Sequence, residues 1–173
     1  EGGAHQSIGT PLIGMSKPGL ASFEPAFTDE LSAIMSFAFS YLQTEKTEGQ
    51  DFAIDADLLN DRRGGSVYLR LTTRRIEQFD REIDDTLASE IIDGGYWLVP
   101  PQSSCSVVIA YIGAVAPQVI ESCDQLNRES PGSTAVLAIT SADRLHRGWM
   151  EAQRIRHNGL TKCSAQVEKL LGT

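Results

Sequence analysis

Two apolar runs in the second half of the chain place the strongest constraint on its fold. Residues 107–111 (Val-Val-Ile-Ala-Tyr) and 135–139 (Ala-Val-Leu-Ala-Ile) are short and uninterrupted, as in strands that are buried on both faces of a parallel sheet. Between them, Gly113 lies in a turn, and Pro117 suits the first turn of a helix that we expect to reach about residue 127. A strand, a helix and a second strand in this order predict an α/β layer with parallel strands.

The same alternation extends through the rest of the chain. After the second strand, Ser141 or Asp143 starts a helix to about residue 156, and residues 162–171 form a last helix or its beginning. Upstream, residues 20–24 and 66–72 have the composition of strands.

We therefore predict an α/β fold made of two partial domains, each a mostly parallel sheet flanked by helices. Paired glycines and paired prolines around residues 94–101 indicate the boundary. This divides the chain into residues 1–95 and 96–173.

Two stretches of the first half carry further signals. Thr28 caps a helix whose apolar positions from Leu31 to Leu42 recur at helical spacing, and Phe37 and Tyr41 widen that face. A helix this apolar is buried or lies at a subunit interface. Residues 76–93 are acidic and predict a loop or an amphipathic helix with a solvated outer face.

Charge and cysteine content exclude several classes of protein. The 173 residues carry a formal net charge of −8, which argues against binding to nucleic acid or to an anionic membrane surface. No apolar run is long enough to cross a membrane. Cys105, Cys123 and Cys163 are too widely spaced for a zinc site, and their odd number fits structural thiols in a reducing cytoplasm.

His5 is the first candidate for chemistry, in the run Gly2-Gly3-Ala4-His5-Gln6. Small residues permit close approach of a ligand, and an imidazole can transfer protons near neutral pH. A loop histidine with a structural or merely solvated role is the alternative.

Arg74 is the second candidate, with Arg75 next to it, because the predicted strand 66–72 runs into both. Planar guanidinium groups suit carboxylates and phosphates. The alternative is that these arginines pair with the acidic stretch downstream.

For the other notable polar residues we expect structural roles rather than catalytic ones. Pro25 ends a strand, and Glu24 and Glu30 flank the start of the next helix, so we interpret both acids as structural. His146 is expected to be half-buried on its helix, and His157 to lie near that helix's C-terminus. We find no dinucleotide-binding or phosphate-binding glycine loop.

The residues 2–6 resemble the Gly-x-x-His-Gln loop of transketolases, and nearly the whole chain resembles the later part of homodimeric 2-oxo-acid dehydrogenases of the pyruvate dehydrogenase type. Residues 23–31 are similar to the strand-to-helix junction of their pyrimidine-binding domain. Residues 140–149 are similar to the Val-Thr-Ser stretch of their C-terminal domain, which is followed by a helix with a tryptophan. The resemblance assigns residues 1–95 to the second half of the pyrimidine-binding domain and 96–173 to the first part of the C-terminal domain.

The resemblance implies a parent protein that uses thiamine diphosphate and magnesium. Such a homodimer decarboxylates a 2-oxo acid and passes the acyl unit to a lipoyl group on a partner acyltransferase. His5 would be catalytic beside the substrate, Gln6 would position the substrate, and Arg74 would bind its anionic group. The cofactor-activating glutamate and the magnesium-diphosphate motif lie upstream in the family, so we expect this chain to be a portion that holds no cofactor and is inactive by itself.

Two alternatives remain open. Arg74 and the His5-Gln6 pair favour transketolase-like ketol transfer between sugar phosphates, whereas residues 140–149 favour the dehydrogenase. Ala4 stands where pyruvate dehydrogenases often carry another histidine, and their matching strand is not followed by arginine. The chain is alternatively a non-catalytic oligomerisation or regulatory module held together by the helix from Leu31 to Leu42.

Overall fold

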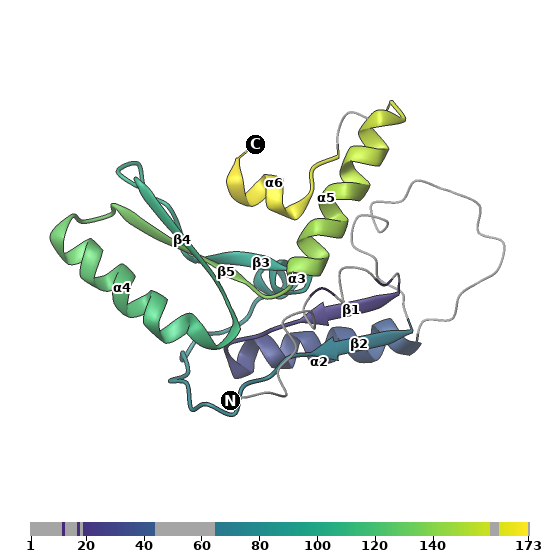
Figure 1. The fold of residues 1–173 in the computed structure, drawn as a ribbon, viewed down its shortest axis with the longest axis horizontal. Coiled ribbons are helices and arrows are strands. Elements are labelled where there is room, and N and C mark those ends of the chain that lie inside the picture. Colours follow the sequence, from purple (N-terminus) through teal and green to yellow (C-terminus); the bar gives the residue numbers. More distant parts are fainter. Residues whose placement is uncertain (1–11, 13–16, 18, 44–64, 160–162, 173) are drawn as a thin grey trace.

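The computed structural model describes residues 12, 17, 19–43, 65–159 and 163–172. His5 and Gln6, and with them the predicted catalytic loop, lie outside the described residues. All the elements below are seen in Figure 1.

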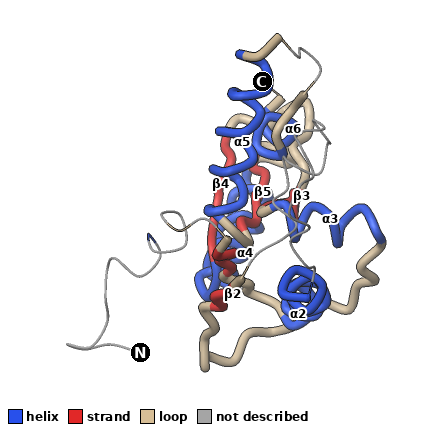
Figure 2. The backbone as a smooth tube through the Cα atoms, turned by 90° about the vertical axis from the view of Figure 1, so that its right-hand side faces the viewer, coloured by secondary structure: helices blue, strands red, loops and turns tan. Residues whose placement is uncertain are grey.

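The first half contains a two-stranded parallel sheet and one long helix. Strand β1 (Leu20–Phe23) pairs with β2 (Ser66–Leu69), with Leu20 opposite Ser66 and Phe23 opposite Leu69. Helix α2 (Thr28–Gln43) follows β1 directly and runs beneath this pair. When the molecule is turned by 90°, α2 is viewed almost along its axis (Figure 2).

The second half contains a three-stranded sheet in the order β3-β5-β4. Strands β4 (Val107–Ile112) and β5 (Thr134–Ile139) are parallel, and η2 (Gly113–Val115) and α4 (Ala116–Glu129) connect them as the sequence predicts. Strand β3 (Gly95–Val99) joins β5 in the antiparallel direction. The second sheet is therefore mixed, because β3 enters from a tight turn after α3 (Asp85–Asp93) rather than through a crossover helix.

Two helices complete the chain. Ser141 caps α5 (Ala142–His157) by accepting a hydrogen bond from the Arg144 backbone N, as predicted. The short α6 (Gln166–Leu171) packs near α5. None of the helices in the described part of the chain is both long and apolar enough to cross a membrane.

One hydrophobic core joins both sheets. Its largest members come from β1, α2, α3, β3, β4, β5 and the turn between β1 and α2: Phe23, Phe27, Ile34, Phe37, Tyr41, Ile91, Tyr96, Tyr111 and Val136. Backbone contacts also link the two halves, since Glu24 N donates to Thr140 O at 2.8 Å. The division into domains at residues 95 and 96 stays a prediction.

One predicted boundary was wrong, since strand β2 ends at Leu69 rather than at Thr72. The acidic stretch contains both predicted alternatives, because residues 76–84 are a loop and residues 85–93 are helical. On α2 the buried face includes Ile34, Phe37, Ala38 and Tyr41, while Phe39 and Leu42 are 57% and 47% exposed. The helix is therefore buried on one side only. All three cysteines are free thiols, as predicted.

Candidate functional site

A polar patch forms where the two strands of the first sheet end. Because β1 and β2 are parallel, Glu24 and Arg70, which follow them, lie at the same edge, and Arg70 Nη1 donates to Glu24 Oε2 at 3.1 Å. The carboxyl ends of strands are the usual ligand-binding edge of open α/β sheets. We call Glu24 and Arg70 the strand-end patch.

The start of α4 borders this patch. Gly113 has a φ of +62°, and a Cβ built on it would lie 2.6 Å from Glu24 Oε1. Only glycine allows the turn before α4 to approach the Glu24 side chain this closely. The patch therefore joins the carboxyl ends of β1 and β2 to the N-terminal end of a helix from the second half.

The predicted site residue Arg74 lies five positions after the last residue of β2, and its side chain contacts α4 rather than the Glu24–Arg70 pair. Its exposed side chain donates from Nη1 to Gln118 Oε1, on α4, at 3.2 Å, and its backbone N donates to Thr72 Oγ1 at 3.1 Å. Among the described residues, the Arg74 side chain meets no carboxylate. The described residues therefore do not show the predicted alternative, in which Arg74 pairs with a carboxylate of the acidic stretch. Arg75 is exposed as well.

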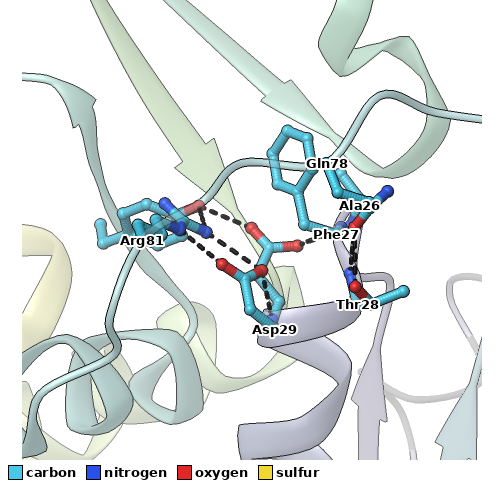
Figure 3. A network of polar contacts seen from close by, with 8 residues as sticks. Ala26, Phe27, Thr28, Asp29, Gln78 and Arg81 are labelled. Atoms are coloured by element: carbon cyan, nitrogen blue, oxygen red, sulfur yellow. Dashed lines mark hydrogen bonds and ion pairs between the residues drawn. The ribbon is translucent and has the colours of Figure 1, made fainter.

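A second polar cluster is buried at the start of α2 (Figure 3). Glu30 is 1% exposed, and its Oε2 accepts hydrogen bonds from the backbone N of Ala26 at 2.7 Å and of Phe27 at 2.9 Å. The Tyr96 hydroxyl, on β3, donates to Glu30 Oε1 at 2.7 Å. Burial raises the pKa of the Glu30 carboxyl, and the hydrogen bonds and the Arg81 charge oppose that rise.

Arg81 links this cluster to residues 70–84, which we call the connecting segment. Arg81 Nε donates to Asp29 Oδ2 at 2.6 Å, and its Nη2 donates to the Tyr96 hydroxyl at 2.9 Å. The guanidinium carbon also lies 5.1–5.6 Å from the ring centres of three aromatic residues, Phe27, Phe79 and Tyr96. Burial acts to lower the pKa of Arg81, but its hydrogen bonds to Asp29 and Tyr96 outweigh that effect and raise it.

Gln78 anchors the connecting segment at a further point. Its Oε1 accepts hydrogen bonds from Thr28 N and from Thr28 Oγ1, both at 2.8 Å. A side chain 50 residues away in sequence thus satisfies a free N–H at the start of α2. Figure 3 shows Gln78 and Arg81 on either side of this helix end.

A third buried cluster is structural. Asp143 of α5 is 2% exposed, accepts from Ser22 N at 3.1 Å, and forms an ion pair with Arg147 Nε at 2.7 Å. The Ser141 hydroxyl donates to Ser22 O at 2.5 Å. Burial raises the pKa of Asp143, with Arg147 acting against it. These contacts fasten the start of α5 to β1.

The remaining sequence candidates have mixed outcomes. Glu30 does cap a helix, as predicted, since it accepts from the Phe27 backbone N three residues earlier. His146 is exposed, so its predicted half-burial was wrong. The buried face of α5 instead contains Arg144, Gly148, Ala152 and Ile155. His146 is not on that face. His157 ends α5 and is exposed.

Sequence reasoning missed Arg81 and Tyr96. Tyr96 lies in a short extended run between glycines and prolines, and nothing in that run indicates a polar partner. Arg81 offered a weak signal, because it is a single arginine within an acidic stretch. In the part of the chain that the structure describes, no three His, Cys, Asp or Glu side chains come together as a metal site.

Comparisons with known proteins identify the architecture. No known protein-family model matches the sequence, and no curated protein matches it either. Among solved structures, a Pichia stipitis transketolase variant in complex with fructose-6-phosphate is similar with a TM-score of 0.56 and 18% identity. The same enzyme in complex with sedoheptulose-7-phosphate gives a TM-score of 0.57 and 17% identity.

Each of these matches covers 81% of this chain and 17% of the transketolase chain. The chain therefore spans about one sixth of the length of the transketolases that it matches. The α/β fold predicted from the sequence is confirmed, and its arrangement is that of a part of a transketolase.

Proposed function

We propose that the chain is part of the decarboxylating component of a thiamine diphosphate-dependent 2-oxo-acid dehydrogenase of the pyruvate type. The observation that carries this proposal is the transketolase-like fold over 81% of the chain. The sequence run 140–149 favours the dehydrogenase within that architecture. The chain alone is proposed to be inactive.

In this proposal the chain supplies groups that act on the substrate. His5 holds or moves a proton at the substrate oxygen, and Gln6 orients the same substrate. Arg74 provides a cationic guanidinium beside α4, where it binds the substrate carboxylate. Thiamine diphosphate, when bound, supplies the carbanion that makes decarboxylation possible.

The described residues do not fit a magnesium-diphosphate site, because they contain no cluster of metal-ligating side chains. We therefore assign the binding of magnesium and diphosphate to parts of the parent protein other than these residues. The partners proposed for the parent are a second copy of itself and a lipoyl-bearing acyltransferase. The exposed Phe39 and Leu42 on α2 support contact with another subunit, and the free thiols support a cytoplasmic location.

Transketolase-like ketol transfer is the second candidate. It is favoured by the two sugar phosphate complexes of the similar transketolase. The Arg74 guanidinium, whose partner among the described residues is the neutral amide of Gln118, suits a phosphate as well as a carboxylate.

An assay of the intact parent separates the candidates. Purified parent protein with thiamine diphosphate and magnesium is given pyruvate and a lipoylated acceptor, or a ketose phosphate and an aldose phosphate. Acyl transfer to the lipoyl group supports the dehydrogenase, and ketol transfer supports the alternative. Neither activity, together with concentration-dependent dimers in sedimentation, would favour the non-catalytic module.

We expect Arg74→Ala in the parent to raise KM for the anionic substrate about 10–100-fold, since a hydrogen bond to a charged group contributes about 1.5–3 kcal/mol. The substitution should leave the thermal midpoint of unfolding nearly unchanged, because Arg74 is exposed. Steady-state kinetics measure the effect, and Arg75→Ala is the matched control. Equal kinetic effects of the two substitutions would contradict a specific role for Arg74.

A further inference from the structure

The Tyr96 hydroxyl lies between two groups of opposite charge. It donates to Glu30 Oε1 at 2.7 Å and accepts from Arg81 Nη2 at 2.9 Å. Glu30 comes from α2, Arg81 from the connecting segment and Tyr96 from β3, so three separate parts of the chain meet at one oxygen. Glu30 accepts all three of its hydrogen bonds, which is the pattern of an ionised carboxylate.

A second hydroxyl is buried beside this network. Tyr111, on β4, is 4% exposed, and its Oη forms no well-aligned hydrogen bond with the described residues, although hydrogen bonding by the Tyr96 side chain acts to lower its pKa. The Tyr96 and Tyr111 side chains are nevertheless close enough for each to act on the pKa of the other. Burial, followed by the Glu30 charge, raises the pKa of Tyr111, so this hydroxyl keeps its proton. A buried hydroxyl without a well-aligned hydrogen bond is rare in folded proteins.

We propose that Glu30 is a buried proton-binding site, whose carboxyl takes up and releases a proton within the folded chain. In the ionised state Tyr96 donates to Glu30. In the protonated state the Glu30 hydroxyl donates to the Tyr96 oxygen, and the Tyr96 hydroxyl turns to donate to Tyr111. The proton comes from solvent, and only O–H directions change.

Each state satisfies the backbone in the same way. Ala26 N and Phe27 N donate to Glu30 Oε2 whether or not the other oxygen carries a proton. Arg81 keeps its hydrogen bonds to Asp29 and Tyr96 in both states. The Tyr111 hydroxyl, which forms no well-aligned hydrogen bond with the described residues in the ionised state, is the acceptor that the protonated state needs.

The groups around Glu30 come from every element packed against it. They are Asp29 on its own helix, Arg81 on the connecting segment, Tyr96 on β3 and Tyr111 on β4. Helix α3 and strand β2 also pack against α2, and they carry Asp85, Glu90 and Asp93 on α3 and Tyr68 on β2.

The proposal predicts an unusual pH dependence of stability. The pKa of Glu30 is raised above its ordinary value of 4.5, so the folded chain binds this proton more tightly than the unfolded chain does. As the pH rises from 4.5 through the folded-state pKa, Glu30 should therefore lower the free energy of unfolding. Compared with Glu30→Gln, the wild-type chain should gain stability as the pH falls through this window.

Glu168 provides a control of opposite sign. Its hydrogen bonds to Arg156 and to Ala165 N lower its pKa, so it stabilises the folded chain above its ordinary pKa and loses that effect in acid. Compared with Glu168→Gln, the wild-type chain should lose stability as the pH falls. Urea unfolding at a series of pH values measures both differences. The same slope for both substitutions would overturn the proposal.

The relay itself is tested by NMR on the chain with ¹³C-labelled glutamate carboxyls, with Glu30→Gln identifying the Glu30 signal. We expect Glu30 to titrate while the chain stays folded, Tyr111→Phe to move its midpoint to lower pH, and Tyr68→Phe, a tyrosine on β2, to leave it unchanged. A Glu30 signal that does not titrate in the folded chain would overturn the proposal. An unchanged midpoint in folded Tyr111→Phe would refute the relay. If that variant does not fold, the wild-type titration and the urea series still decide whether Glu30 binds a proton.

Discussion

Replacing Gly94 with alanine is expected to lower the free energy of unfolding by about 2–5 kcal/mol. Gly94 follows α3 with a φ of +111°, a conformation that costs other residues about 1–2 kcal/mol. A Cβ at this position would also lie 2.5 Å from Ser141 O and 3.1 Å from Leu145 N. Both are backbone atoms at the start of α5, so the clash cannot be relieved by turning a side chain, and overpacking adds about 1–3 kcal/mol.

The substitution should also disturb the contact between Gly94 and the start of α5, because Gly94 O accepts hydrogen bonds from Thr140 N and Ser141 N. Urea unfolding of Gly94→Ala measures the loss, and Gly159→Ala is the matched control. Gly159 also has a positive φ, +91°, but nothing lies within 4 Å of its Cβ position. The control should therefore show the backbone cost alone, about 1–2 kcal/mol. Equal losses in the two variants would show that close packing of α5 on Gly94 is not what requires a glycine.

Glu30→Ala is expected to lower the free energy of unfolding by about 2–4 kcal/mol. The substitution leaves Ala26 N, Phe27 N and the Tyr96 hydroxyl without their acceptor in a site that is 1% exposed. Each unsatisfied buried group costs about 1–3 kcal/mol. Removal of a buried carboxylate recovers part of this cost, since burial disfavours its charge. The net loss is therefore smaller than the sum of the three groups.

Chemical unfolding measures this effect, with Asp84→Ala as the control. Asp84 caps α3 by accepting from Leu87 N at 2.7 Å, but it is exposed. Loss of that cap should lower the free energy of unfolding by about 1 kcal/mol. A cost for Glu30→Ala no larger than that for Asp84→Ala would mean that Glu30 acts only as a helix cap and does not join the three parts of the network.

The elements that could be predicted from the sequence are those with local causes. The strands β4 and β5, the Pro117 at the start of α4 and the Ser141 cap of α5 each have local causes, and the structure has all of them. The predicted burial of β4 on both faces was wrong, because β4 is an edge strand on which Val107 and Val108 are 45% and 48% exposed. The direction of β3 had no local signal. Strand β3 pairs with β5 only because the chain reverses at Gly94, and the paired residues, from Gly95 with Ile139 to Val99 with Val136, are far apart in sequence.

The candidate site divides in the same way. Arg74 could be singled out because the predicted strand runs into paired arginines, but β2 ends at Leu69, so Arg70 is the arginine at the strand end. The structure places Arg74 beside Gln118 of α4. The partners Glu30, Arg81 and Tyr96 could not be found, because they come from α2, a segment without regular structure and β3. The exposure of His146 depends on which face of α5 packs against the rest of the chain, and helical spacing alone does not fix that face.

Sequence alone determined the α/β class, the order of most strands and helices, and the capping of α5, because backbone preference and apolar spacing act between near neighbours. The predicted capping of α2 by Thr28 was wrong, since the Thr28 hydroxyl donates to Gln78 on the connecting segment. Only the tertiary structure decided how β3 joins its sheet, which side of α2 is buried and how Glu30, Tyr96 and Arg81 form one network. Those outcomes depend on the burial of apolar surface and the desolvation of charge, and both require side chains that are distant in sequence to occupy the same space.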